Sequence, residues 1–353
     1  MSGNATTVVF THGKTIAVYL LLLNKVNASI NCALFAWRYR RIRHSLAKIV
    51  TCNRLTRLPS LGKSIPPDTN GVTTLQTLKS SSPMLKEWKE RITWLRLGFS
   101  IYDIQFPRGN AESWRKLFKP CACQRLFIPE LLPSIDSLLY VDTDVLFFTG
   151  VENLWMNFEK FDDFQIAALA PEGEDFATNW YTRFARHPFY GPLGVNSGVM
   201  LMNLTRMRDV GWGDRMMPLY DKYRLNITWG DQDLINIFFH HFPDLLHLYG
   251  CEWNYRPDHC MYSSTCKRAE SLGVRVLHGS RGWFHREDKQ PAFKAVFDAF
   301  ERFDLPPKRT KDHYHKALLN PLETKLRSLI NGPNCGKVTD LFLKTLRQQI
   351  MTN

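Results

Sequence analysis

The stretch SLLYVDTDVLFF at residues 137–148 decides the fold. It is a continuous apolar run that only Asp142, Thr143 and Asp144 interrupt, and such a run is typical of a parallel strand buried on both faces. Residues i and i+2 of a strand point to the same side, so the two carboxylates face the same way. Burying them without partners would be costly. A bound Mn²⁺ or Mg²⁺ would remove that cost, because these ions prefer oxygen ligands.

Other interpretations of this acidic pair are open. The carboxylates could lie in a solvated turn or could pair with an arginine. A phosphatase of the haloacid dehalogenase type also has Asp-x-Asp after a strand, but it normally carries Thr two positions later, where this chain has Leu146. Open α/β sheets bind ligands at the carboxyl ends of their strands, and this placement favours a ligand site.

The sequence around this stretch alternates between strand and helix patterns, which predicts an α/β fold. Apolar spacing predicts the helices, and short apolar runs predict the strands. The last part of the chain is basic, polar and helical, with an apolar stripe that predicts a packing surface. The predicted helices are 84–97, 113–118, 124–132, 231–240 and 292–303, the predicted strands are 101–106, 166–170, 198–202 and 274–277, and the stripe is Leu318, Leu322, Leu326 and Ile330.

The net charge of +13 comes mainly from the beginning of the 353-residue chain. Residues 1–67 contain ten Lys and Arg and no Asp or Glu, so the remaining residues carry only +3. No nucleic-acid-binding motif accompanies the basic segment, which argues against a nucleic-acid function. Apolar residues make up 44% and charged residues 22% of the chain, which excludes a mostly disordered chain and a multi-span membrane protein.

Residues 15–23 form an apolar run within this basic segment. The run is shorter than the roughly 20 residues that a transmembrane helix needs. It has the size of the apolar part of a signal peptide or of an anchor remnant, and its acid-free surroundings resemble a mitochondrial transit peptide. It could also be a strand or helix of the body. Pro, Gly, Ser and Thr make residues 59–83 a predicted linker.

Five motifs carry a resemblance to a known family. They are YVDTDVLFF at 140–148, GVNSGVMLMN at 194–203, NITWGDQDLINIFF at 226–239, CEWNYRPDHC at 251–260 and LHGSRG at 277–282. Together they resemble the glucoside xylosyltransferases of glycosyltransferase family 8 over about residues 84–300. The resemblance implies a GT-A fold, which is a Rossmann-like mixed sheet flanked by helices. It also implies a retaining, Mn²⁺-dependent enzyme that uses UDP-xylose and adds α-1,3-linked xylose to O-linked glucose on epidermal-growth-factor-like repeats, Notch among them.

The resemblance also assigns the site residues. Asp142, Asp144 and His278 match the metal site, while Asp231 and Gln232 match the catalytic positions on the donor sugar and the reacting face. Retention without an evident pair of carboxylates favours front-face displacement over double displacement, with the leaving phosphate deprotonating the acceptor and the Gln232 carbonyl dipole assisting. Asp233 is expected to cap a helix or to act from behind the site. The matched donor-binding positions are Arg125, Asp142, Asn196, Ser197, Gly198, Asp231, Gly279, Arg281 and Lys289.

These assignments have alternatives in ordinary structure. Arg125 could form a helix salt bridge, Asn196-Ser197-Gly198 could be a turn, and Arg281 and Lys289 could be solvated cations. Gly279 is expected to let the backbone approach phosphate. We interpret the aromatic clusters at 180–190 and 253–256 as acceptor-side surfaces, with packing against the core as the alternative.

Cysteine usage predicts an oxidising compartment. Cys251, Cys260 and Cys266 lie close together but without the Cys-x₂-Cys spacing of zinc sites, so at least one disulfide is expected. Four sequons fit this compartment, and the family implies the lumen of the Golgi or endoplasmic reticulum, with type II membrane association. An anchor is not evident in this chain. The sequons are at Asn4, Asn27, Asn203 and Asn226.

One departure from the family concerns the nucleotide pocket. The family's body opens with a strand and a Gly-containing turn that cradle uridine, followed by a helix and a second strand, and this unit is not evident in residues 1–83. We therefore expect an atypical basic N-terminal segment and linker over 1–83, a catalytic domain over 84–305 and a helical appendage over 306–353. Two alternatives follow: a family member with another UDP-sugar donor, such as UDP-glucose or UDP-galactose, or a defective homologue that lacks part of the uridine pocket.

Overall fold

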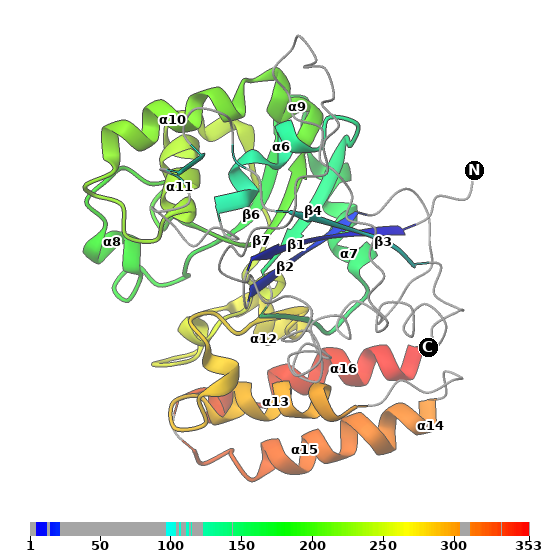
Figure 1. Ribbon diagram of the computed structural model, residues 1–353. Helices are drawn as coiled ribbons and strands as arrows, with labels where there is room; N and C mark the ends of the chain where they lie inside the picture. Colours follow the sequence, from blue (N-terminus) through cyan, green and yellow to red (C-terminus); the bar gives the residue numbers. More distant parts are fainter. Residues whose placement is uncertain are drawn as a thin grey trace, which may run out of the picture.

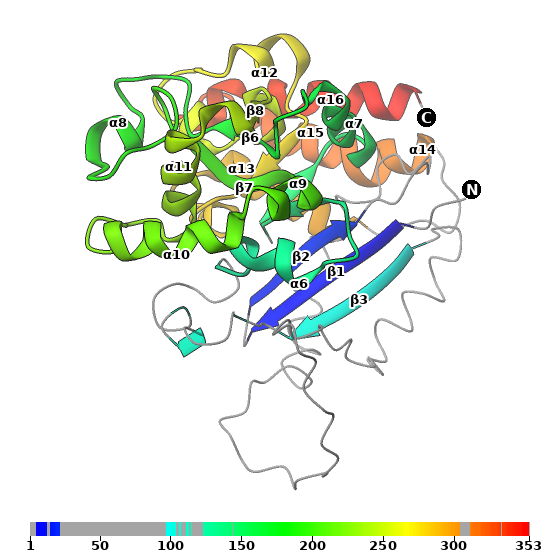
Figure 2. The same ribbon diagram turned by 90° about the horizontal axis from the view of Figure 1, so that it is seen from above.

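A seven-stranded mixed sheet, in the order β3-β1-β2-β4-β7-β6-β8, lies at the centre of the protein (Figure 1). The computed structural model describes residues 5–12, 15–21, 97–103, 106, 111–112, 114, 123–142, 144–303, 311–332 and 334–352. Seen from above, β2, β1 and β3 lie side by side at one end of the sheet (Figure 2). The strands are β1 (Ala5–His12), β2 (Thr15–Leu21), β3 (Leu97–Asp103), β4 (Ser137–Val141), β6 (Ala167–Pro171), β7 (Val195–Asn203) and β8 (Leu246–Leu248).

Alternate residues of the central strands pack into two separate cores, as the two-residue period of a strand requires. In β4, Leu139 and Val141 join one core, whereas Leu138 and Tyr140 join the other. The apolar run at 137–148 is not a single strand as predicted, because β4 ends at Val141 and residues 145–147 form a strand of a second sheet. β4 itself is buried on both faces, as predicted. Its neighbours β2 and β7 are both antiparallel, however, so the predicted parallel pairing is wrong. Burial on both faces produces a continuous apolar run whatever the direction of the neighbouring strands.

Helices cover both faces of the sheet (Figure 1). The core that contains Leu138 and Tyr140 packs against α6 (Ile128–Leu131), α9 (Leu204–Asp209), α10 (Trp212–Tyr223) and α11 (Asp231–His241). The opposite core packs against α7 (Val151–Trp155), α12 (Lys267–Leu272), α13 (Pro291–Arg302), α14 (Lys311–Tyr314), α15 (Asn320–Arg327) and α16 (Asp340–Thr352). Within the described part of the chain, α8 spans Trp180–Phe184, and short 3-10 helices include Gln124–Phe127 and Pro257–His259.

Strand directions bring the polar motifs to one edge of the sheet. The pairing places the carboxyl ends of β1, β3, β4, β6 and β8 at the same edge, together with the amino end of β7. The chain leaves β4 at Asp142 and enters β5 (Val145–Phe147), which pairs with β9 (Val276–His278) in a separate two-stranded sheet. Val145 lies opposite His278 in this pair. This antiparallel register therefore places His278 next to Asp142 and Asp144.

The predicted elements compare with the structure as follows. The helices at 124–132, 231–240 and 292–303 and the strands at 166–170, 198–202 and 274–277 are confirmed to within a few residues at their ends. The strand predicted at 101–106 is β3, which begins four residues earlier. Residues 15–21 form β2, which is the alternative of a body strand for the apolar run. Of the helices predicted at 84–97 and 113–118, only residues 97 and 114 lie within the described residues. Among the described residues, no helix combines the length and apolar composition needed to cross a membrane.

The C-terminal helices are tied to the body by packing and by a disulfide. Leu318, Leu322 and Leu326 are buried in the core, whereas Ile330 is 49% exposed because α15 ends at Arg327. The stripe is thus confirmed except at its last residue. The disulfides Cys251–Cys266 and Cys260–Cys335 confirm the prediction of at least one disulfide. Because their sulfur atoms are bonded to each other, these cysteines are not zinc ligands.

We predict that Leu326→Ala lowers the free energy of unfolding by about 2–5 kcal/mol, because it leaves a cavity in a core that the C-terminal helices share with β9 and α13. The matched variant Ile330→Ala removes a half-exposed side chain and should cost less than about 1 kcal/mol. Urea unfolding measures both. Equal losses in the two variants would contradict the assigned packing.

Candidate active site

Asp142, Asp144 and His278 form a group that could hold a divalent cation. One ligand atom from each residue lies within 4.8 Å of the others. His278 Nε2 is 3.8 Å from Asp142 Oδ2 and 3.4 Å from Asp144 Oδ1. Two carboxylate oxygens and one imidazole nitrogen are a donor set that suits a divalent ion. The three residues assigned to the metal by sequence are therefore brought together.

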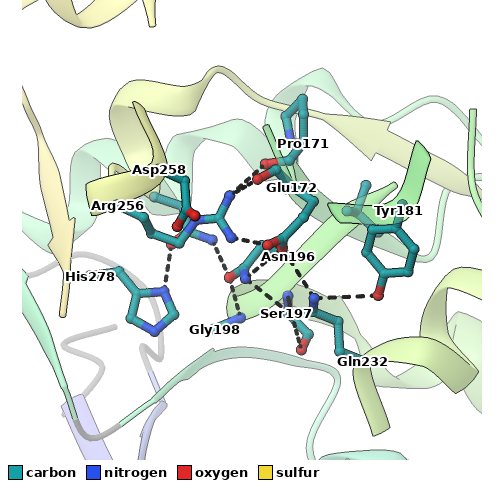
Figure 3. A network of polar contacts seen from close by, with 12 residues as sticks. Pro171, Glu172, Tyr181, Asn196, Ser197, Gly198, Gln232, Arg256, Asp258 and His278 are labelled. Carbon is teal, nitrogen blue, oxygen red and sulfur yellow. Dashed lines mark hydrogen bonds and ion pairs between the residues drawn. The ribbon is translucent and has the colours of Figure 1, made fainter. Parts of the chain in front are cut away.

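The His278 ring is held in the tautomer that metal binding needs. Its Nδ1 is 2.9 Å from Asn254 Oδ1, and Asn254 Nδ2 donates to Asn196 Oδ1 at 2.8 Å (Figure 3). Because the Asn254 oxygen can only accept, Nδ1 carries the proton. Nε2 is then the ring nitrogen that faces the two carboxylates, an orientation that is common when a partner holds a metal-ligating histidine.

Gly198 makes room for this histidine. A Cβ built at Gly198 would overlap the His278 ring and would lie 3.0 Å from Asp142 Oδ2. The Gly198 carbonyl also accepts from the Asp142 amide at 2.8 Å. Only glycine lets β7 lie this close to the metal group, so this predicted donor-site residue has a demonstrable steric role.

Arg125 joins three elements around the acidic pair. It lies in the turn Gln124–Phe127, is buried, and donates to the Ser197 carbonyl and to Asp142 Oδ1, the latter at 2.8 Å. Its Nε is 2.7 Å from Asp231 Oδ2. Its guanidinium lies 4.1 Å from the Tyr140 ring centroid. The two interpretations of Asp142 are thus compatible, since one oxygen pairs with an arginine while the other faces His278.

The environment shifts the pKa values of Asp231 and Asp144 in opposite directions. Burial raises the pKa of Asp231 above its ordinary value, and Arg125 offsets only part of this effect. Burial also acts to raise the pKa of Asp144, but the adjacent His278 outweighs it and lowers that pKa overall. At neutral pH, Asp231 is therefore a carboxylate that the fold holds at a cost, whereas Asp144 is one that the fold favours.

Gln232 belongs to a polar network on the same edge (Figure 3). Its Oε1 accepts from Asn196 Nδ2 at 3.0 Å and from Ser197 N at 3.1 Å, and its Nε2 lies 3.1 Å from Glu172 Oε2. Glu172 in turn forms an ion pair of 2.7 Å with Arg256. The Gln232 amide is therefore held in one orientation, and its predicted neighbours Asn196 and Ser197 are the groups that hold it.

Glu172 and Tyr140 were not predicted from the sequence. Tyr140 donates to Asp142 Oδ1 at 2.8 Å, and its ring packs against the Arg125 guanidinium. Glu172 follows directly after β6, just as Asp142 follows β4. A search for acidic residues at strand ends would have found it by the same rule that singled out Asp142.

The cluster at 253–256 is a buried scaffold, so its interpretation as an acceptor surface is wrong. Trp253, Asn254, Tyr255 and Arg256 are each at most 5% exposed. Asn254 orients His278, and Arg256 neutralises Glu172. A single sequence could not distinguish these buried roles from an exposed aromatic patch, because both use aromatic and polar residues in alternation.

Of the predicted diphosphate residues, Gly279 and Arg281 lie in the turn after β9, whereas Lys289 lies in a second turn just before α13. The Gly279 amide donates to the Asp144 carbonyl at 2.7 Å, and a Cβ at this position would overlap the Phe284 ring. The close approach that requires glycine is therefore to Phe284. Arg281 is held by Asp258 at 2.5–2.6 Å, and Lys289 is half-exposed with Nζ 4.0 Å from Asp288. A diphosphate role for Arg281 and Lys289 stays a prediction.

Comparison with known proteins supports the motif-based resemblance. Residues 77–278 match the family model described as Glycosyl transferase family 8. Glucoside xylosyltransferase 1 of Rattus norvegicus is 52% identical over 266 residues, which are 72% of this chain and 60% of the rat protein. Glucoside xylosyltransferase 2 of Xenopus laevis is 48% identical over 284 residues, which are 77% of this chain and 65% of that protein. Mouse xyloside xylosyltransferase 1, a solved apo structure, matches with a TM-score of 0.41 and 20% identity, covering 57% of this chain and 82% of that chain.

The chain belongs to glycosyl transferase family 8, because the family model matches more than half of it. Its mixed sheet with helices on both faces is the GT-A-type architecture that the motifs predicted. The chain spans 60% of the rat relative and 65% of the frog relative.

We predict that Gly198→Ala weakens divalent-cation binding at least about tenfold, because the new methyl group displaces an oriented ligand. The fold should persist, as judged by circular dichroism. Gly173→Ala is the matched control, since its Cβ would meet only atoms of Asn179 among its nearest neighbours. Calorimetric titration with Mn²⁺ measures the affinity, and an unchanged affinity in Gly198→Ala would remove its steric role.

A second prediction concerns stability in EDTA. Because the folded pKa of Asp231 is raised, Asp231→Asn should raise the melting temperature, and its advantage should grow as the pH rises through that pKa. Because the folded pKa of Asp144 is lowered, Asp144→Asn should lower the melting temperature at neutral pH, and its deficit should disappear in acid. Thermal melts between pH 4 and pH 8 would refute this view if both variants shifted in the same direction.

Proposed function

We propose that this protein transfers xylose from UDP-xylose, with retention and in α-1,3 linkage, to O-linked glucose on epidermal-growth-factor-like repeats of the Notch type. The observation that carries the proposal is that the metal group, the Arg125–Asp231 pair and the Gln232 amide all lie at one edge of the sheet. The relatives named glucoside xylosyltransferases support the sugar and the acceptor class.

The proposed cofactor is Mn²⁺, with Mg²⁺ as a possible substitute. Asp142, Asp144 and His278 would hold it, and Nε2 of His278 fits this role because the contact of Nδ1 with Asn254 turns it toward the two carboxylates. The bound ion would supply charge neutralisation to the diphosphate leaving group. Arg281 in the turn that follows β9 and Lys289 in the turn before α13 would add positive charge, and Arg125 would keep Asp142 in place.

The donor sugar would be bound by side chains that combine donors and acceptors. Asn196 and Ser197 offer both kinds of hydrogen-bonding group to sugar hydroxyls. Asp231 would accept from hydroxyls as a carboxylate, and Arg125 favours that ionised form despite the burial. The Arg125 contacts to Asp142 and Asp231 would thus couple the diphosphate and sugar ends of the donor.

Retention would proceed by front-face displacement. Glu172 is the carboxylate beside Gln232, but it is engaged by Arg256 at 2.7 Å, by Asn196 at 2.8 Å and by Gln232 at 3.1 Å. These contacts make it a poor nucleophile, so a double displacement is disfavoured. The acceptor hydroxyl would lose its proton to an oxygen of the departing diphosphate. The electrostatic role of the Gln232 carbonyl requires its contacts with Asn196 and Ser197 to open when the donor binds.

We further propose that the protein works in the lumen of the Golgi or endoplasmic reticulum, in association with the membrane. The disulfides Cys251–Cys266 and Cys260–Cys335 support an oxidising compartment. Two sequon residues are described: Asn203 accepts from the Arg206 amide at 3.0 Å, and Asn226 donates to the Arg186 carbonyl at 2.9 Å.

A second candidate is a homologue that has lost donor binding. It is favoured by one observation: β1 and β2 form consecutive antiparallel strands, where the resemblance implies a strand, a turn, a helix and a second strand. Titration of the protein with UDP in Mn²⁺ separates the candidates, since only a working nucleotide pocket gives metal-dependent binding. Comparison of UDP-xylose with UDP-glucose and UDP-galactose then tests the donor.

We predict that Asp142→Asn and Asp144→Asn each abolish Mn²⁺-dependent transfer while the fold persists. Gln232→Ala should lower kcat by about a hundredfold with little change in the KM for donor, because an electrostatic contribution of this kind acts on the transition state. Asp162→Asn, in an exposed loop away from the site, serves as the control. Transfer from UDP-xylose to a glucosylated repeat measures all four, and a rise in KM alone would make Gln232 a binding residue.

A further inference from the structure

Asp233 is a buried carboxylate directly behind the candidate catalytic residues. It is fully buried in the first turn of α11. Its Oδ2 accepts from the backbone amides of Thr228 at 2.7 Å and Trp229 at 2.6 Å, and its Oδ1 accepts from Tyr181 Oη at 2.9 Å. Asp233 therefore fastens the loop that leads into α11 and the helix α8 to the turn that carries Asp231 and Gln232.

His187 lies within ion-pair distance of the Asp233 carboxylate. Its side chain is fully buried in the loop between α8 and β7, and Nε2 lies 3.4 Å from Asp233 Oδ1. Its Nδ1 is 2.9 Å from the Pro188 carbonyl. Because a carbonyl only accepts, Nδ1 carries a proton in either charge state. A neutral His187 would then direct the Nε2 lone pair at the Asp233 carboxylate, whereas the imidazolium directs an N–H at it.

The surroundings of His187 favour the imidazolium. Burial alone would lower the pKa of His187, but Asp233 and the Pro188 carbonyl outweigh burial and raise it above the ordinary value. Among the described residues, Asp233 faces the ring from α11 and Tyr181 faces it from α8, with ring centroids 6.0 Å apart. Tyr181 stays a neutral phenol, because burial and the nearby Asp233 raise its pKa well above the usual range.

Tyr181 connects the His187–Asp233 pair to Gln232 in the candidate site. The Tyr181 hydroxyl accepts from Gln232 Nε2 at 3.3 Å (Figure 3). It also accepts from Asn236 Nδ2 at 2.9 Å while it donates to Asp233. Asn236 also fixes the backbone of Val195, one residue before Asn196. A shift of Asp233 would therefore turn the Tyr181 hydroxyl and release one of the contacts that orient the Gln232 amide.

We infer that protonated His187 is a positioning residue, which holds Asp233 and Tyr181 so that the Gln232 amide keeps its orientation in the site. The consequence for transfer rests on the proposed function, in which Gln232 acts at the reacting face. The ordering is complete at pH values below the ordinary pKa of histidine, and it is lost as the pH rises through the raised pKa of the folded protein.

The first test is a nuclear magnetic resonance titration of the full chain in EDTA. His187→Gln identifies the His187 ring signal by its disappearance, and Gln232→Ala identifies the Gln232 side-chain amide signal in the same way. We expect the ring to titrate above the ordinary value of about 6.5, with the Gln232 amide shifting at the same midpoint. In His187→Gln, whose amide donates without titrating, that shift of Gln232 should vanish. A ring that titrates at or below the ordinary value, or a Gln232 signal that ignores it, overturns the inference.

The second test is kinetic and uses UDP-xylose with Mn²⁺. His187→Leu should lower kcat about tenfold with the KM for donor within about twofold, because the buried ion pair with Asp233 is lost. His187→Gln should keep kcat within about threefold and lose the alkaline fall in activity that His187 causes. The matched control His240→Gln changes an exposed histidine whose Nδ1 lies 3.0 Å from the Phe189 carbonyl, and it should leave kcat and the pH profile unchanged.

The outcomes separate the inference from the proposed function. Wild-type kcat and an unchanged pH profile in His187→Leu would overturn the inference even when transfer is observed. Absence of transfer by the wild-type chain under all conditions would overturn the proposed function, and the titration of the Gln232 amide would still decide whether His187 positions it. If His187→Leu does not fold, His187→Gln and the titration decide alone.

Discussion

The Arg125 guanidinium is the interaction on which the rest of the site depends. It is buried and contacts the Ser197 carbonyl, Asp142 and Asp231, which come from β7, the end of β4 and the start of α11. Three acidic residues at one sheet edge would repel one another in a buried environment. One cation placed between two of them removes much of that repulsion and sets their relative positions. The Arg125 guanidinium thus holds Asp142 of the metal group next to Asp231 in the first turn of α11.

Around this cation the protein uses hydrogen-bonded amides to hold what the charges bring together. Asn254 orients His278, Asn196 joins Asn254 to Glu172, and Asn236 ties α11 to β7. An amide side chain offers donors and an acceptor without a net charge. It can therefore connect charged residues in a buried network without adding to the repulsion. The site is rigid because most of its polar atoms have a partner inside the protein.

The acidic pair of the metal group could be singled out from the sequence because its physical signal is local, whereas His278 was assigned through the motif resemblance. An apolar strand that is followed by two carboxylates is unusual in a short stretch of sequence. A similar change between polar and apolar residues within a few positions identified α11 and β7. Strand direction was not predicted, since burial on both faces leaves the same pattern in parallel and antiparallel neighbours. The roles of Asn254 and Arg256 were missed for a different reason. Their partners His278 and Glu172 lie 24 and 84 residues away in the sequence, and only the fold brings them together.

The disulfide between Cys260 and Cys335 has a consequence for how the site forms during synthesis. Cys260 follows shortly after Asn254 and Arg256, and its partner lies among the C-terminal helices that pack on β9. The nearer disulfide Cys251–Cys266 closes the segment that carries Asn254 and Arg256, but that segment is joined covalently to the C-terminal helices only after residue 335 has been synthesised. Domains usually fold as units during synthesis, and here the covalent link between this segment and the C-terminal helices can form only after residue 335 has been added. A nascent chain that stops short of the C-terminal helices would carry the acidic pair without the covalent link that secures its surroundings.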